Sequence, residues 1–413
     1  MLDNGKAEGV RKIKRFEKYC LKDIATVSQG FTFSRLYQGK KNLKWNYFKV
    51  ADIGLNPNSK YLTNAINTIS DITMEEIGVL PFPKGSIVFP RVGAALFNNN
   101  KKILAQDGMV DDNVLVLTVT DTSKCWHEFL YYYLQGIPLA KWCNSGLVPV
   151  INTKTVLSQM VFLPPLPEQQ KIATILSTQD KVIELKEKLL VQKQQQKKYL
   201  MQQLLTGKKR LPGFGGEWKT IHLNEISCRI ETKNTVGNNN VLTISAQYGL
   251  INQTEFFDKV IASDNKSNYY LLSKDEFAYN RSYSKGYPYG TIKRLKRYVQ
   301  GVVSPLYICF AVNKKLASLD FLEQYFEASI INREIQSIVQ EGARNHGMLN
   351  VAVDDFFRIK ITMPEIEEQK EIAKILSTAD HEIDLLQKSI EAEKQKKKAL
   401  MQLLLTGKVR VKI

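Results

Sequence analysis

The sequence lacks the features that mark several large classes of protein. No run of 18 apolar residues occurs among its 413 residues, so it predicts no membrane-spanning helix. Residues 1–18 are charged and contain no apolar stretch, which indicates a short flexible arm rather than a secretory signal. The five cysteines form no CxxC pair, which argues against a disulfide framework and a zinc ribbon. These absences favour a protein of the reducing cytoplasm.

Catalytic motifs are missing as well. The sequence contains no GxxxxGK[ST] phosphate loop, no GxSxG elbow and no HExxH pair. Its four histidines are scattered, so no metal site is predicted. The sequence therefore indicates a noncatalytic protein, and an active site assembled from distant residues is left as an open alternative.

The charge is strongly positive. Lysine and arginine number 58 against 41 aspartates and glutamates, which gives a formal net charge of +17. Such an excess favours polyanionic partners, either nucleic acid or an anionic membrane surface, although it also serves simple solubility. With 44% hydrophobic residues over this length, the chain is expected to form two or more folded domains.

The sequence contains an internal repeat. Residues 164–210 align without a gap with residues 364–410, and 25 of the 47 pairs are identical. The similarity extends more faintly upstream, where Phe89 to Arg91 resembles Tyr279 to Arg281. The contrast between near-identical and divergent parts indicates one scaffold that carries two different globular domains.

Each near-identical segment is predicted to be a long helix. Prolines stand at the start of each segment, and Gly207 and Gly407 lie just past the expected helix ends, as is typical of helices. Apolar residues recur at heptad spacing and predict a helix–helix seam. The seam residues are Ile172, Leu176, Ile183, Leu190, Leu200, Leu204, Ile372, Leu376, Ile383, Leu386, Ile390, Leu400 and Leu404.

These two helices are expected to pair with each other as an antiparallel intramolecular coiled coil. Their matched length and seam favour this pairing, which has an approximate twofold axis. The alternatives are that each helix packs on its own globular domain, or that the helices pair between chains. A helix from Glu168 to Leu205 would measure about 57 Å, long enough to separate two domains by one to two turns of B-DNA.

The fold class is predicted to be α+β, with two globular domains separated by the two helices. Strands are expected at residues 85–89, 113–119, 240–245 and 304–312, and helices at residues 126–135 and 319–339. The predicted division is an arm at 1–18, a domain at 19–163, a helix at 164–210, a second domain at 211–362, and a second helix with its tail at 363–413.

One turn-rich loop in the second domain, residues 279–298, combines basic, amide and aromatic side chains. Arginine and asparagine bond to base edges, and lysine neutralises phosphates. The candidate DNA contacts are Asn280, Arg281, Tyr283, Lys285, Tyr287, Tyr289, Lys293, Arg294 and Arg297. The alternative is a solvated hairpin whose tyrosines pack on the domain.

The first domain offers two weaker stretches of the same kind. The first contains Lys40, Lys41 and Lys44, and the second contains Arg91, Asn98, Asn99, Lys101 and Lys102. Arg91 occupies the position that matches Arg281, which favours the second stretch. For both stretches the alternative is an ordinary surface loop.

The order of variable domain, repeated helix, variable domain and repeated helix resembles the DNA specificity subunit of type I restriction-modification systems. The resemblance rests on residues 163–173 and 200–208, on their second copies at 363–373 and 400–408, and on residues 211–218 at the start of the second domain. It covers nearly the whole chain. One departure is that no Pro-Gly-Phe run precedes Leu21, where the first domain begins.

The resemblance implies a function. Each globular part would be a target recognition domain that reads one half of a bipartite asymmetric site in double-stranded DNA. The chain, without a cofactor of its own, would direct methyltransferase and restriction subunits that use S-adenosylmethionine and ATP. The main alternative is a noncatalytic coiled-coil interaction scaffold. A self-contained restriction enzyme is disfavoured, because the length leaves no room for its catalytic domains.

Overall fold

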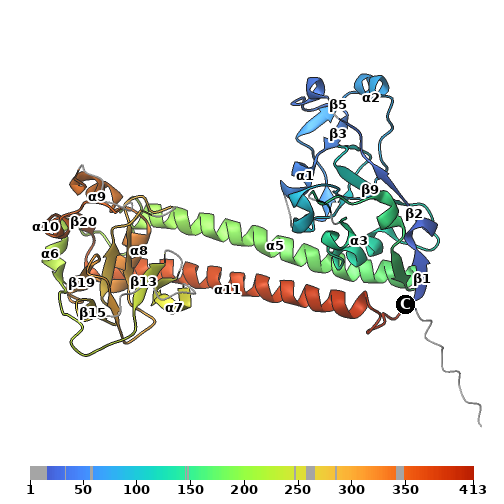
Figure 1. Cartoon of the computed structure of the whole chain (residues 1–413). Helices are drawn as coiled ribbons and strands as arrows, with labels where there is room; N and C mark the ends of the chain where they lie inside the picture. Colours follow the sequence, from blue (N-terminus) through green and yellow to red (C-terminus); the bar gives the residue numbers. More distant parts are fainter. Residues whose placement is uncertain are drawn as a thin grey trace, which may run out of the picture. The chain divides into compact units, whose positions relative to one another are not determined.

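The computed structural model consists of two compact units, each assembled from segments far apart in the sequence. It describes residues 16–32, 34–55, 59–144, 146, 148–245, 248–256, 266–283, 286–340 and 348–413 (Figure 1). The first unit joins Met1–Glu187 to Lys388–Ile413, and the second is Lys188–Gln387. Each unit therefore contains one globular domain and half of each long helix.

The globular part of the first unit is built on a five-stranded sheet in the order β2-β9-β6-β7-β4, beside a three-stranded sheet β5-β3-β8 and the pair β1-β10. The strands are β1 Glu17–Cys20, β2 Ala25–Gln29, β3 Trp45–Phe48, β4 Tyr61–Leu62, β5 Asn67–Ile69, β6 Ile87–Pro90, β7 Lys102–Leu104, β8 Met109–Val110, β9 Val114–Val119 and β10 Met160–Leu163. The helices are α1 Val50–Leu55, α2 Asp71–Ile77, α3 His127–Gln135 and α4 Thr153–Leu157, with short 3-10 turns η1 Leu21–Asp23, η2 Arg35–Tyr37, η3 Ala94–Asn98 and η4 Leu139–Trp142.

The globular part of the second unit contains a four-stranded sheet, β12-β19-β16-β17, and the pairs β11-β20, β13-β14 and β15-β18. The strands are β11 Lys219–His222, β12 Ser227–Arg229, β13 Leu242–Ser245, β14 Gly249–Asn252, β15 Tyr270–Ser273, β16 Phe277–Asn280, β17 Thr291–Arg294, β18 Gln300–Val303, β19 Ile308–Val312 and β20 Lys360–Met363. The helices are α6 Leu223–Ile226, α7 Gln253–Phe256, α8 Leu319–Glu327, α9 Asn332–Ile338 and α10 Val353–Phe357. The α+β prediction is confirmed.

Two long helices, α5 Leu166–Leu204 and α11 Ile366–Leu404, belong partly to each unit. In the first unit, the start of α5 lies antiparallel to the end of α11: Lys397 Nζ is 2.5 Å from Asp180 Oδ1, and Lys186 Nζ is 2.8 Å from Glu393 Oε1. In the second unit, the end of α5 pairs with the start of α11 through Lys197 and Asp380, at 2.5 Å. The predicted intramolecular antiparallel pairing is confirmed.

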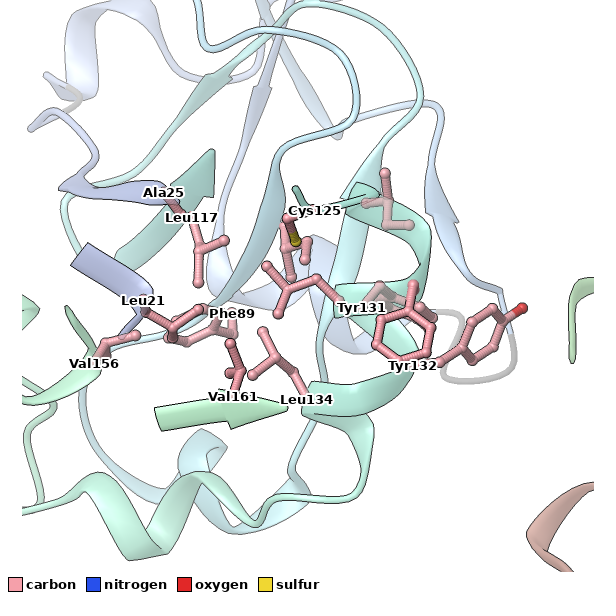
Figure 2. Close-up of a cluster of buried hydrophobic side chains, with 14 of the residues drawn as sticks. Leu21, Ala25, Phe89, Leu117, Cys125, Tyr131, Tyr132, Leu134, Val156 and Val161 are labelled. Carbon is pink, nitrogen blue, oxygen red and sulfur yellow. The ribbon is translucent and has the colours of Figure 1, made fainter. Parts of the chain in front are cut away.

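Each hydrophobic core takes the start of one long helix and the end of the other. In the first unit, Ile172 and Leu176 of α5 and Leu404 of α11 belong to the buried core. The same core contains the strand residue Phe89 and Leu134 of α3 (Figure 2). In the second unit, Leu204 of α5 and Ile372 and Leu376 of α11 join the corresponding core. The remaining seam residues lie between these ends: Ile183 and Ile390 are buried, and Leu190, Leu200, Ile383, Leu386 and Leu400 are half-buried. Packing on the domains and pairing of the helices therefore occur together.

A buried ion pair closes each unit. Arg410, beyond the end of α11, places Nε and Nη2 2.8 and 2.5 Å from the Glu168 carboxylate at the start of α5. In the same way, Arg210 lies beyond the end of α5. Its Nε and Nη2 are 2.8 and 2.7 Å from the Glu368 carboxylate. Both glutamate side chains are almost fully buried, so each depends on its arginine for compensation of its charge.

Each long helix is followed by a glycine that packs against an aromatic ring. Gly207 and Gly407 have φ values of 69° and 70°, the left-handed conformation common after a helix. A Cβ on Gly207 would lie 3.3 Å from Trp218, and one on Gly407 would lie 3.1 Å from Phe16. Phe16 therefore occupies the place of Trp218, although the sequence before the first domain lacks the motif that precedes Trp218.

Two expected boundaries change. The helix predicted over residues 319–339 is interrupted between α8 and α9, where Ser329 has a φ of 57°. A β-strand begins at Glu17, within the predicted arm, because β1 pairs with β10 along its whole length. Residues 1–15 of that arm lie outside the described residues.

Removal of one closing arginine should destabilise the unit that it closes. We expect Arg410→Ala to lower the free energy of unfolding of the first unit by about 2–4 kcal/mol, because the Glu168 carboxylate stays buried without its cation. Thermal unfolding followed by circular dichroism measures this effect. Adding Glu168→Gln should recover part of the loss, and Lys412→Ala, which removes an exposed charge from the same tail, should leave stability unchanged. Equal melting temperatures for wild type and Arg410→Ala would contradict the closing role.

Candidate nucleic-acid interface

The predicted DNA-contacting stretch of the second domain, residues 279–298, contains the end of β16, the connection to β17 and all of β17. Near its start, the side chain of Arg281 is buried. Arg281 is 8% exposed. Its Nε and Nη2 donate to the carbonyl of Leu306 at 3.1 and 2.9 Å, and its Nη1 donates to the carbonyl of Val351 at 3.0 Å. The guanidinium thus holds three chain segments together. The Arg281 guanidinium therefore has a structural role in this domain.

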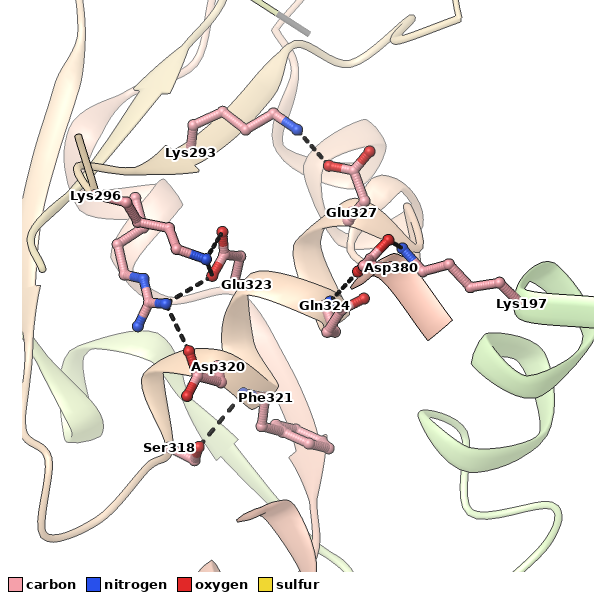
Figure 3. A network of polar contacts seen from close by, with 11 residues as sticks. Lys197, Lys293, Lys296, Ser318, Asp320, Phe321, Glu323, Gln324, Glu327 and Asp380 are labelled. Atoms are coloured by element: carbon pink, nitrogen blue, oxygen red, sulfur yellow. Dashed lines mark hydrogen bonds and ion pairs between the residues drawn. The ribbon is translucent and has the colours of Figure 1, made fainter. Parts of the chain in front are cut away.

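The basic residues of β17 are neutralised by α8. Arg294 Nη2 lies 2.5 Å from Asp320 and 2.8 Å from Glu323, and Lys293 pairs with Glu327 (Figure 3). The Tyr287 hydroxyl donates to the same Glu327 at 2.8 Å. Arg294 is also buried, so this cluster fixes β17 against α8 and adds little net charge for a phosphate.

The exposed part of this loop is smaller than the sequence suggests. Tyr283 is 65% exposed, and Arg297, whose Nη1 lies 3.7 Å from Glu255 Oε2, keeps 55% of its side chain exposed. Asn280 and Tyr289 are half-buried, and Asn280 Oδ1 accepts from the Ser282 amide at 3.0 Å. Lys285 lies outside the described residues.

Two lysines of the first domain are buried, contrary to expectation. Lys101 is 1% exposed and donates to Asn99 Oδ1 at 2.6 Å and to the Ile137 carbonyl at 2.9 Å. Lys102 is 2% exposed and donates to the Ser59 carbonyl. Burial lowers the pKa of Lys101 to about 7, and burial together with the charge of Lys397 lowers the pKa of Lys102 to about 8. Neither ammonium faces solvent to meet a phosphate.

The residues before these lysines divide between structure and surface. Asn99 has a positive φ, and its Oδ1 also accepts from the Leu139 amide at 2.9 Å, so it has a structural role. Arg91 is half-buried, whereas Asn98 is exposed at the end of η3. Its neighbour Phe97, 68% exposed, escaped the sequence analysis because a lone phenylalanine normally predicts core.

The first lysine stretch of this domain is on the surface. Lys40 and Lys41 are exposed, and Lys40 Nζ lies 5.7 Å from the ring centroid of Tyr37. Lys44 is 60% exposed and pairs with Asp71 at 2.8 Å, and this hydrogen bond lowers the pKa of the aspartate. The preceding turn adds Leu36, 81% exposed, which the sequence analysis also missed. Exposed cations and apolar groups together suit contact with a nucleic-acid backbone and its base edges.

Neither a cluster of metal-binding side chains nor a membrane-crossing helix is found in the described part of the chain. No group of three or more histidine, cysteine, aspartate or glutamate side chains could hold a metal ion there. None of the described helices is long and apolar enough to cross a membrane.

Comparison with known proteins gives consistent matches along the chain. The family description "Type I restriction modification DNA specificity domain" matches residues 13–195 and 216–394. The putative type I restriction enzyme MjaX specificity subunit of Methanocaldococcus jannaschii is 25% identical over 95% of this chain and 93% of its own length. The MjaVIII specificity subunit of the same organism is also 25% identical, over 64% of this chain and 65% of its own length.

Solved structures share the fold. The S subunit of a type I restriction-modification system from M. genitalium matches with a TM-score of 0.56 at 14% identity, over 96% of this chain and 98% of that one. The HsdS subunit from Thermoanaerobacter tengcongensis matches with a TM-score of 0.50 at 13% identity, over 95% and 97% of the two chains.

The two buried lysines should make the stability of the first unit rise with pH. Their folded pKa values, about 7 and about 8, lie below the ordinary 10.5, so between these values the unfolded chain binds more protons than the folded one. We expect the free energy of unfolding, measured in urea at pH 7 and pH 9, to increase more for wild type than for Lys101→Met/Lys102→Met. Lys141→Met, at an exposed position, should behave as wild type. Identical pH dependence in wild type and the double variant would refute this.

Proposed function

Because the chain belongs to the type I restriction-modification DNA specificity family, we propose that its two globular domains each read one half of a bipartite asymmetric DNA site. Specificity subunits of this family are noncatalytic and determine DNA target recognition within the restriction-modification complex. The boundaries that we propose for the two target recognition domains are residues 19–163 and 211–362, with the helical segments at 164–210 and 363–413 between and after them.

The observation that carries this proposal is that the scaffold contacts are repeated while the loops are not. The ion pairs Arg410–Glu168 and Arg210–Glu368 are equivalent contacts, one in each unit. The exposed loop residues have no such equivalence: Tyr283 and Arg297 on one domain contrast with Lys40, Lys41 and Asn98 on the other. One frame that presents two different surfaces suits a DNA site whose halves differ in sequence.

The proposed reading set is the exposed remainder of the predicted one. It consists of Lys40, Lys41, Lys44, Asn98, Tyr283 and Arg297. Arg281, Arg294, Lys101 and Lys102 are left out because they are buried, and Lys293 because its side chain is only 12% exposed and is paired with Glu327. Lysines would supply the backbone affinity that positions each domain, and the amide, tyrosine and arginine would supply base contacts.

The helices carry a candidate surface for partner subunits. Leu185 and Leu385 occupy equivalent positions of the repeat and are 53% and 52% exposed. An exposed leucine that occurs once in each copy of the repeat suits two copies of one partner. We assign this partner as the methyltransferase subunit, which would hold S-adenosylmethionine, while a restriction subunit would use ATP. A complex that acts on genomic DNA would be located in the cytoplasm.

A second candidate function is a coiled-coil scaffold whose basic residues only maintain solubility. The pairing of Lys293 and Arg294 with acidic residues of α8 favours it locally. The two functions differ in salt dependence, because DNA binding through phosphates weakens steeply as the salt concentration rises.

Methylation mapping tests the DNA-reading role. In cells that carry this chain and a methyltransferase subunit, we expect a methylated motif of two short halves with a fixed gap, absent when the chain is deleted. Tyr283→Ala/Arg297→Ala should relax one half of the motif, and Lys40→Ala/Lys41→Ala should lower occupancy without changing the sequence read. Lys141→Ala, at an exposed position outside the proposed set, is the control. Unchanged methylation on deletion, with the methyltransferase active, would refute the role.

Copurification tests the partner surface. Leu185→Asp and Leu385→Asp should each remove one of two methyltransferase copies, and the double variant should remove both, because a carboxylate replaces an apolar contact. Gln192→Asp adds the same charge at an exposed position of α5 and should keep both copies. Full retention by the double variant would show that docking occurs elsewhere.

A further inference from the structure

The contacts at the ends of the two long helices cannot distinguish α11 from a second copy of α5. The repeat offset of 200 places Arg210 where Arg410 stands and Lys197 where Lys397 stands. Glu168 and Asp180 could therefore pair with Arg210 and Lys197 of a second copy as they do with Arg410 and Lys397. The ends of the helices are thus compatible with self-pairing between chains.

The apolar ends are equally interchangeable. Ile172 and Leu176 pack in one core with Leu400 and Leu404 of α11. The residues 200 positions earlier are again leucines, Leu200 and Leu204. Hydrophobic burial would therefore reward pairing of α5 with α5 about as much as pairing of α5 with α11.

Contacts nearer the middle of the helices break this equivalence, and four charged residues among them would meet like charges in self-pairing. Lys186 Nζ lies 2.8 Å from Glu393 Oε1, and Gln179 Nε2 donates to the same carboxylate at 2.8 Å. Lys193 Nζ lies 2.7 Å from Glu382 Oε2. The Lys186–Glu393 pair belongs to the first unit, and the Lys193–Glu382 pair belongs to the second.

Self-pairing would replace both attractions with repulsions. In a pair of two α5 helices, the place of Glu393 beside Lys186 is taken by Lys193 of the second copy. In a pair of two α11 helices, the place of Lys193 beside Glu382 is taken by Glu393 of the second copy. Twofold symmetry makes each clash occur twice, and like charges at a helix interface disfavour association.

We propose that Lys186, Lys193, Glu382 and Glu393 form a charge code that selects pairing of α5 with α11 and rejects pairing of either helix with its own copy in a second chain. The code is needed because the duplicated scaffold otherwise offers two nearly equivalent ways to bury the same seam. It acts on the free chain and does not depend on the DNA target or on partner subunits.

Four double substitutions test the code, all with one lysine changed to glutamate and one glutamate changed to lysine, so that the net charge stays constant. Lys186→Glu/Glu382→Lys and Lys193→Glu/Glu393→Lys make both pairs within the chain repulsive and both self-pairings attractive. Lys186→Glu/Glu393→Lys and Lys193→Glu/Glu382→Lys are the matched controls, which keep the pairs within the chain attractive.

Sedimentation equilibrium of the full chain at low salt gives the readout. We expect the first two variants to raise the ratio of dimer to the 47.2 kDa monomer at least about tenfold over wild type and over the matched controls. Changing all four residues combines both dimerising variants and should restore the wild-type ratio, because attraction within the chain and repulsion between copies both return.

That rescue separates the code from general loss of folding, since a misfolded variant would not recover on further substitution. The proposal is overturned if the first two variants dimerise no more than the matched controls, or if the fourfold variant dimerises as they do.

Discussion

The closure of each helix end by a buried glutamate–arginine pair is the constraint on which the architecture depends. Glu168 and Glu368 lie at the starts of the long helices, and their arginines lie beyond the ends of the opposite helices. A buried carboxylate needs its cation to offset the cost of desolvation, so neither helix packs stably on its domain without the other. The hydrophobic cores repeat this dependence, because each takes apolar side chains from both helices.

Because both units share these helix contacts, their loops are free to differ. Asp180 accepts from the Tyr132 hydroxyl at 2.6 Å in the first unit, and Asp380 accepts from Gln324 at 2.7 Å in the second. The same aspartate is present in both repeats, but its hydrogen-bond partner differs. Each domain therefore contacts the helices at an equivalent position through a different side chain. Such anchoring lets the two domains diverge in sequence and present different surfaces without altering the helices.

The sequence predicts the scaffold better than the surface, for a physical reason. Heptad spacing and helix-end residues are local and periodic, so α5 could be recognised within two residues of its bounds, and the repeat identified α11 as its counterpart. Whether a lysine is exposed depends on distant segments: Lys101 is buried by residues around Ile137, and Arg281 by Leu306 and Val351. A basic run therefore overestimates the candidate interface. The equivalence of Phe16 and Trp218 was hidden because only an aromatic ring is shared.

The order of synthesis is opposite to the order in which the two cores are completed. Glu168 precedes Arg410 by 242 residues, whereas the second unit closes between Arg210 and Glu368, 158 residues apart. At ribosomal rates of about 5–20 residues per second, the first domain waits roughly 10 to 50 seconds for the segment that covers Ile172 and Leu176. The nascent chain thus exposes an apolar helix stripe throughout that interval, and the domain that is made first becomes the last to be finished.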